Sequence, residues 1–404
     1  MKFKEWKQST EDFIIRWVSR KIVFPAMFFA GSLKPLKENK VVFLELRLLS
    51  LSNNHKELYK RLTEDYDLDV HCIFFKIGTA RRREIYKHYA EYIREAADAK
   101  YLIFSEGNDV HACVWKRKGQ HQLNTWHAAG AFKRFGLSTA KKLFGDTAAN
   151  MKRFPSHGDY DLVTVSSPEV EWAYIEAMGK EKDPECIKAV GLSRTDIFYK
   201  DGEKAAAYER FYKQFPEAKG KKVILYAPTF RGKTVGAETP DRLSVKMFYE
   251  SLHEDYVLVF KHHPIVHKRP EVPEEYSTFA RDLSDTMTIE DLLFVSDICI
   301  SDYSSLIYEY SLFEKPMIFF AYDLDDYFDW RGFYYNYDEL TPGPVYKTNE
   351  EMLDYIEHID ERFDREEVRR FKERFMSACD GHATDRIMKM FFEPSLEKYK
   401  KKDK

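Results

Sequence analysis

The sequence predicts an α/β protein made of two consecutive units, each a parallel sheet with helices on both faces. Apolar strand patterns alternate with amphipathic helix patterns from about residue 40 onward, an order typical of parallel sheets. The same alternation starts again after a charged, helical stretch at 200–222. The chain of 404 residues also exceeds what one hydrophobic core usually organises, so two domains with a cleft between them are expected.

Five strands are predicted in the first unit. A polar turn at Ser52-Asn-Asn after the first strand leads into a helix over 55–63, and a helix rich in Arg and Tyr near 81–98 separates the second strand from the third. The short apolar runs, rich in β-branched and aromatic residues, favour strands at 40–46, 70–75, 101–104, 121–126 and 162–165.

The second unit repeats this pattern with four predicted strands. The stretch Lys200–Lys222 ends in Gly220-Lys-Lys and is expected to link the two units. Apolar runs predict strands at 223–227, 256–261, 298–301 and 316–320, with helices between them. Two doubly wound domains are therefore expected to face each other. Their ligand is expected in the crevice at the carboxyl ends of the strands.

The N-terminal segment, 1–36, is predicted to be an amphipathic helix that associates with a membrane surface. Apolar residues recur at helical spacing from Trp6 through Phe13 and Trp17 to Ile22, interleaved with Lys and Arg. Such a segment can lie in a bilayer interface, although a helix packed on the domain's own core would show the same pattern. We expect an N-terminal domain at 37–200, a C-terminal domain at 201–395 and a basic, solvated tail at 396–404.

Composition excludes several classes of function. A net charge of −3, from 64 basic and 67 acidic residues, provides no global positive field for nucleic acid. The five cysteines are widely spaced and form no CxxC pair, which fits neither a disulfide framework nor a zinc site and indicates a reducing, cytosolic setting. No run of about 18 uncharged apolar residues predicts a membrane-spanning helix.

Two strand ends in the second unit carry side chains suited to phosphate. Pro228, Thr229 and Arg231 follow the first of these strands, where a turn, a hydroxyl and a planar cation would meet a bound anion. Arg231 could instead pair with a structural acid. Lys261 and the histidines before Pro264 follow the next strand and can neutralise negative charge or move a proton. One of the two histidines is expected to face the core or solvent.

A third strand end, after Ser301, predicts an anion site at a helix start. Ser304 and Ser305 are expected to open a helix whose free backbone N–H groups favour a phosphate, with Asp302 beside them. Glu309, one turn further on, would accept hydrogen bonds from a ribose or another diol. The alternative is that Asp302 and Ser304 are ordinary helix caps.

A basic patch in the first unit is suited to an anionic lipid or to a phosphate-bearing acceptor. Lys133, Arg134, Lys141 and Lys142 flank apolar side chains between residues 132 and 144. No metal site is expected. The histidines near 262–267 have no carboxylate at ligand spacing, and the aspartates at 323–326 are predicted on a loop beyond a strand.

The order of these blocks resembles the CDP-glycerol glycerophosphotransferase family of teichoic acid polymerases and primases, most strongly over about 225–350. The matching blocks are Tyr-Ala-Pro-Thr-Phe-Arg (226–231), Lys-His-His-Pro (261–264), Ser-Asp-Tyr-Ser-Ser (301–305), Lys-Pro-Met-Ile-Phe-Phe-Ala-Tyr-Asp (315–323), Arg-Gly-Phe-Tyr-Tyr (331–335) and Pro-Gly-Pro (342–344). In the first unit, Asn124-Thr-Trp-His127 is similar to the family's Thr-Trp-His-Gly block, with Ala128 in place of the glycine. This departure puts the neighbouring backbone geometry in doubt.

The resemblance implies a GT-B-like fold, a CDP-linked donor held by the C-terminal domain and an acceptor approached from the N-terminal one. On that basis His127 is the expected base, His263 stabilises the phosphoryl oxygens or the leaving group, and Trp126 lies on the acceptor side. CDP-glycerol is the expected donor, with CDP-ribitol as an alternative, and neither a metal nor a cofactor is required.

The expected partners follow from the same resemblance. The acceptor would be a polyprenyl-diphosphate-linked precursor, reached from the cytoplasmic face at the inner leaflet of the membrane, and nucleic acid is not expected. Two other functions stay open: a GT-B glycosyltransferase that uses a nucleotide sugar, and a membrane-docking scaffold without catalytic activity.

Overall fold

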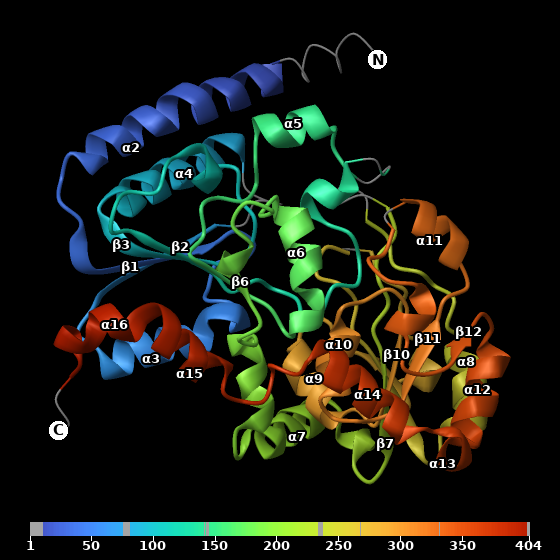
Figure 1. Ribbon diagram of the computed structural model, residues 1–404. Coiled ribbons are helices and arrows are strands. Elements are labelled where there is room, and N and C mark those ends of the chain that lie inside the picture. The colour runs from blue at the N-terminus through green and yellow to red at the C-terminus, as the bar shows by residue number, and fades with distance from the viewer. Residues whose placement is uncertain are drawn as a thin grey trace.

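Two parallel sheets form the centre of the molecule (Figure 1). The structure, a computed structural model, describes residues 11–75, 81–140, 142, 145–232, 237–266, 268–330 and 332–401. The first sheet has the strand order β2-β1-β3-β4-β5-β6. Its strands are β1 (Lys37–Glu45), β2 (Asp69–Phe74), β3 (Ala99–Phe104), β4 (His121–Asn124), β5 (Leu162–Thr164) and β6 (Ile187–Lys188). The five predicted strands are confirmed. The two-residue β6 is too short to leave a pattern in the sequence.

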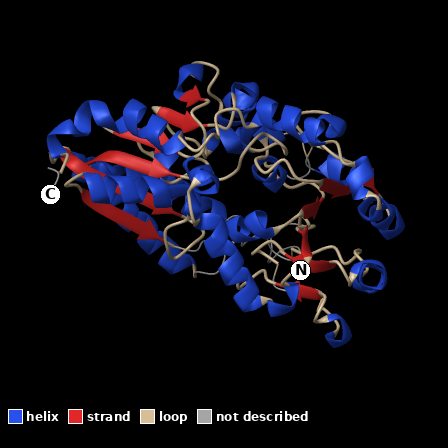
Figure 2. Cartoon of the chain, turned by 90° about the horizontal axis from the view of Figure 1, so that it is seen from below, coloured by secondary structure: helices blue, strands red, loops and turns tan. Residues whose placement is uncertain are grey.

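The second sheet has the order β12-β11-β10-β7-β8-β9, and every pairing between neighbours in both sheets is parallel. Its strands are β7 (Lys222–Tyr226), β8 (Tyr256–Phe260), β9 (Ala280–Asp282), β10 (Ile298–Ser301), β11 (Met317–Phe320) and β12 (Val345–Tyr346). The four predicted strands are confirmed, and the short edge strands β9 and β12 were not predicted. Helices surround both sheets (Figure 2).

The order of the strands indicates where each domain has a crevice. The first sheet is built outward from β1 to β2 and then reverses to β3, and the second reverses between β7 and β10. Ligands of doubly wound folds bind outside the carboxyl ends of strands at such reversals. The loops after β7 and β10 contain two of the predicted phosphate motifs, so the fold brings these motifs together.

Strand β1 shows how the first sheet is held. Val41 and Phe43 face one hydrophobic cluster, whereas Val42 and Leu44 face another, as the alternation of side chains along a strand requires. Buried residues of α3 (Asn53–Asp65) line the first cluster, and those of α4 (Arg82–Ala97) line the second. A parallel sheet covered on both faces therefore needs the nearly continuous apolar runs from which its strands were predicted.

The remaining helices complete both layers. The first domain also contains α5 (Ala148–Arg153), α6 (Glu171–Met178) and the 3-10 segment η6 (Ser193–Tyr199). The second contains α7 (Glu203–Gln214), α8 (Val245–Leu252), α9 (Ile289–Val295), α10 (Leu306–Ser311), α11 (Leu324–Trp330), α12 (Asn349–Glu357), α13 (Ile359–Arg362) and α14 (Arg365–Phe375). The predicted linking stretch contains α7, whose Arg210 pairs with Asp291 of α9 through two hydrogen bonds.

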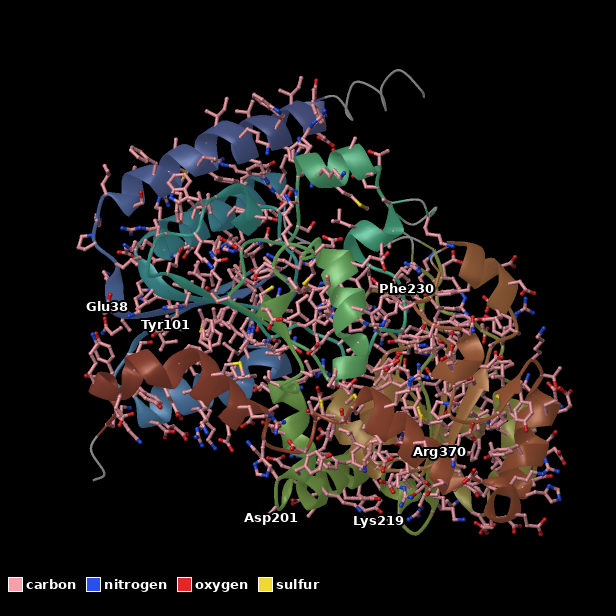
Figure 3. All side chains as sticks on the ribbon, in the orientation of Figure 1. Glu38, Tyr101, Asp201, Lys219, Phe230 and Arg370 are labelled. Carbon is pink, nitrogen blue, oxygen red and sulfur yellow. The ribbon has the colours of Figure 1, made fainter. Side chains whose placement is uncertain are left out.

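The C-terminal segment returns to the first domain, which corrects the predicted boundary at 395. Its elements are α15 (Ala383–Ile387), η10 (Met388–Phe392), α16 (Glu393–Leu396) and η11 (Glu397–Tyr399). Phe391, Phe392 and Leu396 join the cluster beneath β1 and β3, and the Tyr101 hydroxyl bonds to Ser395, at the place marked by Tyr101 in Figure 3. The predicted solvated tail is also partly docked, because the Lys401 backbone N–H donates to the Asp65 carbonyl at 2.8 Å.

The N-terminal helix packs on the first domain with one face and exposes an apolar one. From residue 11 it passes through a π-helical turn, η1 (Ser19–Val23), into α2 (Phe24–Ser32), which lies along α4 at the top of Figure 1. Phe24 and Phe28 are buried, and Asp109 pairs with both Arg16 and Arg20. The exposed apolar face consists of Phe13, Ile14, Ile15, Trp17, Val18, Ile22, Val23, Phe29 and Leu33.

As far as its described residues extend, the buried side of this helix packs on the domain's own core, and membrane association stays a prediction. Among the described residues, no helix is long and apolar enough to cross a membrane.

Candidate active site

Two adjoining cavities open between the domains at the carboxyl ends of their strands. Cavity A, of about 480 Å³, lies between the loops after β1, β4, β7, β8 and β10. Cavity B, of about 430 Å³, extends along the loop after β4. Both are lined by His127, His263, Pro228, Ser304 and Ser305. The predicted catalytic pair therefore comes from opposite domains and lines the same space.

A constrained turn after β4 presents His127. Trp126 has a φ of 54°, in the left-handed region that a tryptophan rarely occupies, and its backbone N–H donates to the Asn124 side-chain oxygen at 2.9 Å. Gly130 has a φ of 62°, and a Cβ there would lie 2.3 Å from the Tyr308 ring. The turn is therefore strained at one end and requires glycine at the other, with His127 between them.

The hydrogen bond made by His127 determines which ring nitrogen can act as a base. Its Nδ1 lies 2.9 Å from the Ser105 carbonyl oxygen, which can only accept, so Nδ1 carries the proton in the neutral ring. Nε2 is then the unprotonated nitrogen. Burial lowers the pKa of His127, although the nearby Glu106 carboxylate opposes that shift. The half-buried ring is therefore neutral near pH 7, with a basic nitrogen available.

His263 takes the opposite tautomer. The Ile265 backbone N–H, which can only donate, points at His263 Nδ1 over 3.2 Å, so Nε2 carries the proton in the neutral ring. Loss of solvation between the walls of the cleft is the main cause that lowers the pKa of His263, and the positive charge of Lys133 lowers it further. Both effects favour the neutral ring. Phe230, labelled in Figure 3, packs beside the ring at a centroid distance of 5.0 Å. His263 is therefore a hydrogen-bond donor and His127 an acceptor.

The other predicted groups after β8 are held by the protein itself. His262 is 2% exposed, and its Nδ1 lies 2.9 Å from the Thr239 hydroxyl, which confirms that one of the two histidines faces inward. Lys261 Nζ donates to the carbonyl oxygens of Ser284 at 2.7 Å and Met287 at 2.6 Å. Lys261 also lines cavity A, and burial lowers the pKa of its ammonium. Its positive charge lies at the cavity wall in a fixed position.

Arg231 and Asp302, both predicted to bind the donor, are not among the residues that line the two cavities, and they are paired within the protein. Arg231 pairs with Asp302 at 3.0 Å and with Asp323 at 2.6 Å, which is the structural alternative that the sequence left open. Asp302 is 2% exposed, and its other oxygen accepts from the backbone N–H of Thr229 and of Tyr303. Two carboxylates satisfy the guanidinium, so this cluster positions the loop that carries Pro228 and Thr229.

The start of α10 reaches both cavities through Ser304 and Ser305. The Ser304 hydroxyl accepts the Leu306 N–H at 3.3 Å, but the N-cap residue of α10 is Ser305, whose side chain makes no cap hydrogen bond. Glu309 lines cavity A but is buried and paired with Arg194 at 2.9 Å. Arg194 was not predicted. In the sequence it is a single arginine in a polar segment before the linking helix, and no motif that could have indicated a function lies near it.

The predicted basic patch is divided between two cavities. Lys133 lines cavity B beside Trp126, and its Nζ donates to the Tyr327 hydroxyl at 3.1 Å. Arg134 and Lys142 line a separate cavity of about 460 Å³, where Arg134 pairs with Glu176. Lys141 lies outside the described residues.

Ala128, the departure from the family block, does not disturb the turn. Among the described residues other than glycine, only Trp126 and Glu314 have a positive φ, so the backbone at Ala128 is one that alanine adopts without strain. Its side chain lines both cavities next to His127.

Comparison with known proteins finds relatives whose names refer to teichoic acid. A family model described as CDP-Glycerol:Poly(glycerophosphate) glycerophosphotransferase matches residues 26–393. A teichoic acid poly(ribitol-phosphate) polymerase of Bacillus spizizenii is 36% identical over 90% of this chain, which spans 58% of that protein's length. A teichoic acid ribitol-phosphate primase of the same species is 34% identical, over 88% of this chain and 92% of its own. A glycerol-phosphate primase of that species is 32% identical over 76% of this chain.

The solved structure of the wall teichoic acid polymerase TagF superimposes with a TM-score of 0.75, at 22% identity over 98% of both chains. Its fold confirms the predicted GT-B-like class, built from two α/β domains. Because the family model covers most of its length, the chain belongs to the CDP-glycerol:poly(glycerophosphate) glycerophosphotransferase family.

Proposed function

We propose that this protein transfers an alditol phosphate from a CDP-activated alcohol to a hydroxyl group of a lipid-linked teichoic acid precursor, either a primer or a growing chain, and releases CMP. The observation that carries this proposal is the pair of complementary histidines in one cleft. His127 offers an unprotonated Nε2, and His263 offers an Nε2–H. One group that takes a proton and one that donates a hydrogen bond are what phosphoryl transfer to a hydroxyl requires.

In the proposed reaction, the acceptor hydroxyl oxygen attacks the β-phosphorus of the donor, and His127 Nε2 takes the hydroxyl proton. A bond forms between the acceptor oxygen and the β-phosphorus, and the bond from that phosphorus to the bridging oxygen breaks. The bridging oxygen leaves with CMP. His263 Nε2–H and the positive charge of Lys261 stabilise the negative charge on the phosphoryl oxygens and on the leaving group.

The two cavities suggest where donor and acceptor bind. Cavity A, with Lys261, Ser304, Ser305 and the second-domain loops, is proposed for the CDP moiety. Glu309, which lines the same cavity, is proposed to accept the ribose hydroxyls. Cavity B is lined by Trp126 and Lys133 and is proposed for the acceptor. Arg134 and Lys142 extend the basic surface for a polyprenyl-diphosphate-linked chain.

Two donors are candidates. CDP-glycerol is the donor that the family resemblance implies. CDP-ribitol is the second candidate, because the two ribitol-phosphate enzymes named above are 36% and 34% identical to this chain and the glycerol-phosphate primase is 32% identical.

The test is CMP release from CDP-glycerol and CDP-ribitol, each with a lipid-linked disaccharide that carries or lacks a first glycerol phosphate. CMP release with only one combination identifies the donor and shows whether the enzyme adds the first unit or extends a chain. If CDP binds but no CMP forms with either donor, the proposal is wrong and a nucleotide sugar is the next donor to try. If CDP does not bind at all, a non-catalytic membrane-docking scaffold is the better description.

The pH dependence of the reaction follows from the state of His127. The base acts deprotonated, so activity rises as pH increases through its pKa. Burial holds that pKa below the ordinary 6.5, although Glu106 raises it against the effects of Arg47 and Arg194. We expect the acid limb of kcat/KM to have its midpoint below pH 6.5, measured by initial rates of CMP release between pH 4.5 and 8. A midpoint above 6.5 would contradict the assignment of His127 as base.

We further propose that the exposed apolar face of the N-terminal helix docks on the inner leaflet of the cytoplasmic membrane, on the cytoplasmic side. Ile14 and Ile22 are each 52% exposed on that face, with Arg16 and Lys21 close by in the helix. Apolar side chains inserted at headgroup depth, flanked by cations, bind anionic bilayers. Such docking would bring the cleft within reach of a lipid-linked acceptor.

Changing both Ile14 and Ile22 to Glu is expected to abolish cosedimentation with anionic phospholipid vesicles. CMP release with a water-soluble acceptor analogue should stay unchanged, because neither side chain lines the cleft. Met390→Glu is the matched control, since Met390 is also 52% exposed but lies on η10. Equal vesicle binding by all three proteins would show that the helix serves only the domain's own packing.

A further inference from the structure

One buried arginine connects the His127 turn to the helices of the other domain. Arg194 Nη1 donates to the His127 carbonyl oxygen at 2.9 Å. Its remaining nitrogens pair with Glu290 at 3.1 Å and Glu309 at 2.9 Å. The two glutamates belong to α9 and α10, and all three charged side chains line cavity A. Arg194 Nη1 also donates to the Asn54 side-chain oxygen at 3.2 Å, so a single guanidinium contacts four separate parts of the site.

We propose that Arg194 is a positioning residue that sets the distance between the base, His127, and the donor bound by the second domain. This inference rests on the proposed function and goes beyond it, because no motif of the family blocks includes Arg194. Arg194 acts through the His127 main chain and through α9 and α10.

The backbone on both sides of Arg194 is anchored, so its guanidinium has a fixed origin. Ser193 bonds to the Thr384 hydroxyl at 2.8 Å. The buried Asp196 carboxylate accepts the backbone N–H groups of Ala383 at 3.0 Å and Thr384 at 2.7 Å, at the start of α15. The C-terminal segment that returns to the first domain therefore locks η6 in place. A rigid support of this kind is what a positioning residue needs.

His127 is consequently held at two points. The Ser105 carbonyl oxygen orients its ring, and Arg194 holds its main chain. The first contact lies within the N-terminal domain, whereas the second is tied to the C-terminal domain through Glu290 and Glu309. Loss of the first would rotate the ring, and loss of the second would let the whole turn move relative to the donor. A shift of about 1 Å in a reacting group can lower a rate by about 10²-fold.

The charges explain why an arginine is needed here. The side chains of Glu290 and Glu309 are 5% and 7% exposed, so both carboxylates require a cation inside the protein. A guanidinium presents five N–H donors in a planar fork and can reach two carboxylates and a carbonyl oxygen at once, whereas an ammonium on a flexible stem cannot hold all three in one geometry. Lysine at 194 would keep the charge but not the geometry.

The experiment compares Arg194→Lys, Arg194→Ala and Glu290→Gln with the wild type in the full-length protein. We expect kcat for CMP release to fall by about 10²-fold in both Arg194 variants. In Arg194→Lys, which keeps the positive charge beside the two carboxylates, the Kd for CDP should stay within about threefold of wild type. Added guanidinium chloride at low millimolar concentration should restore part of the kcat of Arg194→Ala but not that of Arg194→Lys. Glu290→Gln, which keeps the side-chain shape, should give a smaller loss. Arg210→Gln, which breaks the Arg210–Asp291 pair outside the cleft, is the matched control and should keep full kcat.

The outcomes separate this inference from the proposed function. Normal kcat in both Arg194 variants would overturn the inference, as would a loss of CDP binding that accounts for the whole effect. If the wild type itself releases no CMP, the proposed function fails, and crystal structures of wild type and Arg194→Lys then decide the inference. A displaced His127 carbonyl oxygen in the variant would support positioning, and an unchanged 126–130 turn would overturn it.

Discussion

Replacing His127 with alanine is expected to lower kcat by about 10²–10⁴-fold, the range that a positioned general base contributes. The Kd for CDP should stay unchanged, because the predicted donor groups belong to the other domain. The reason lies in the hydrogen bond from Nδ1–H to the Ser105 carbonyl oxygen at 2.9 Å, which leaves Nε2 as the acceptor in the cleft. CMP release under saturating donor and equilibrium binding of CDP measure the two effects separately.

A matched control for this variant is His358→Ala, which removes an imidazole at the end of α12 that is not among the residues lining either cavity. It should keep wild-type kcat. The acid limb of the pH profile provides a second check, because it should disappear from the residual activity of His127→Ala. A residual profile with the same acid limb would assign the titrating base to another group.

The second large effect is expected at His263. Its Nδ1 accepts the Ile265 N–H at 3.2 Å, so the neutral ring presents Nε2–H toward the cleft, where negative charge develops on the phosphoryl oxygens. Removing one such donor costs about 10²–10³-fold in kcat in enzymes that stabilise an oxyanion. His263→Ala should show a loss of this size, measured by CMP release at saturating donor and acceptor.

Two further observations distinguish charge stabilisation from simple binding. His263→Gln retains an N–H donor on its side-chain amide and should recover part of the lost kcat, whereas alanine should not. The double variant His127→Ala/His263→Ala should fall below either single variant if the two groups act in the same transition state. A rise in KM with unchanged kcat in His263→Ala would instead mean that His263 holds the ground-state substrate.

The arrangement of strands was largely predictable, because each long strand is an apolar run bounded by turn signals. Strand β1 and strand β7 are buried on both faces, so their sequences show the continuous hydrophobicity that a covered parallel sheet requires. Strands β6 and β12 have two residues each, too few for a period to be seen, and the three-residue β9 contains Arg281 and Asp282 and so forms no apolar run. Their pairing depends on neighbours that only the folded sheet supplies.

Residues of the candidate site were predictable where a side chain that can bind or react follows the end of a strand. His127, His263 and Ser304 were singled out for that reason, and the structure brings all three to one cleft. Arg231 and Asp302 follow strands as well, but each satisfies the other. Whether a charged side chain points to a ligand or to a protein partner depends on contacts across the sheet, which sequence spacing does not reveal.

The amino-acid sequence by itself determined the class of fold, the strand ends that carry chemistry and the amphipathic helix at the N-terminus, because these depend on local periodicity and on residue type. Only the tertiary structure decided the tautomers of His127 and His263, the return of residues 383–401 to the first domain and the contacts of Arg194. Each of these depends on groups far apart in the chain. The Arg194 guanidinium, for example, meets partners 67, 96 and 115 residues away, and no local pattern encodes such distances.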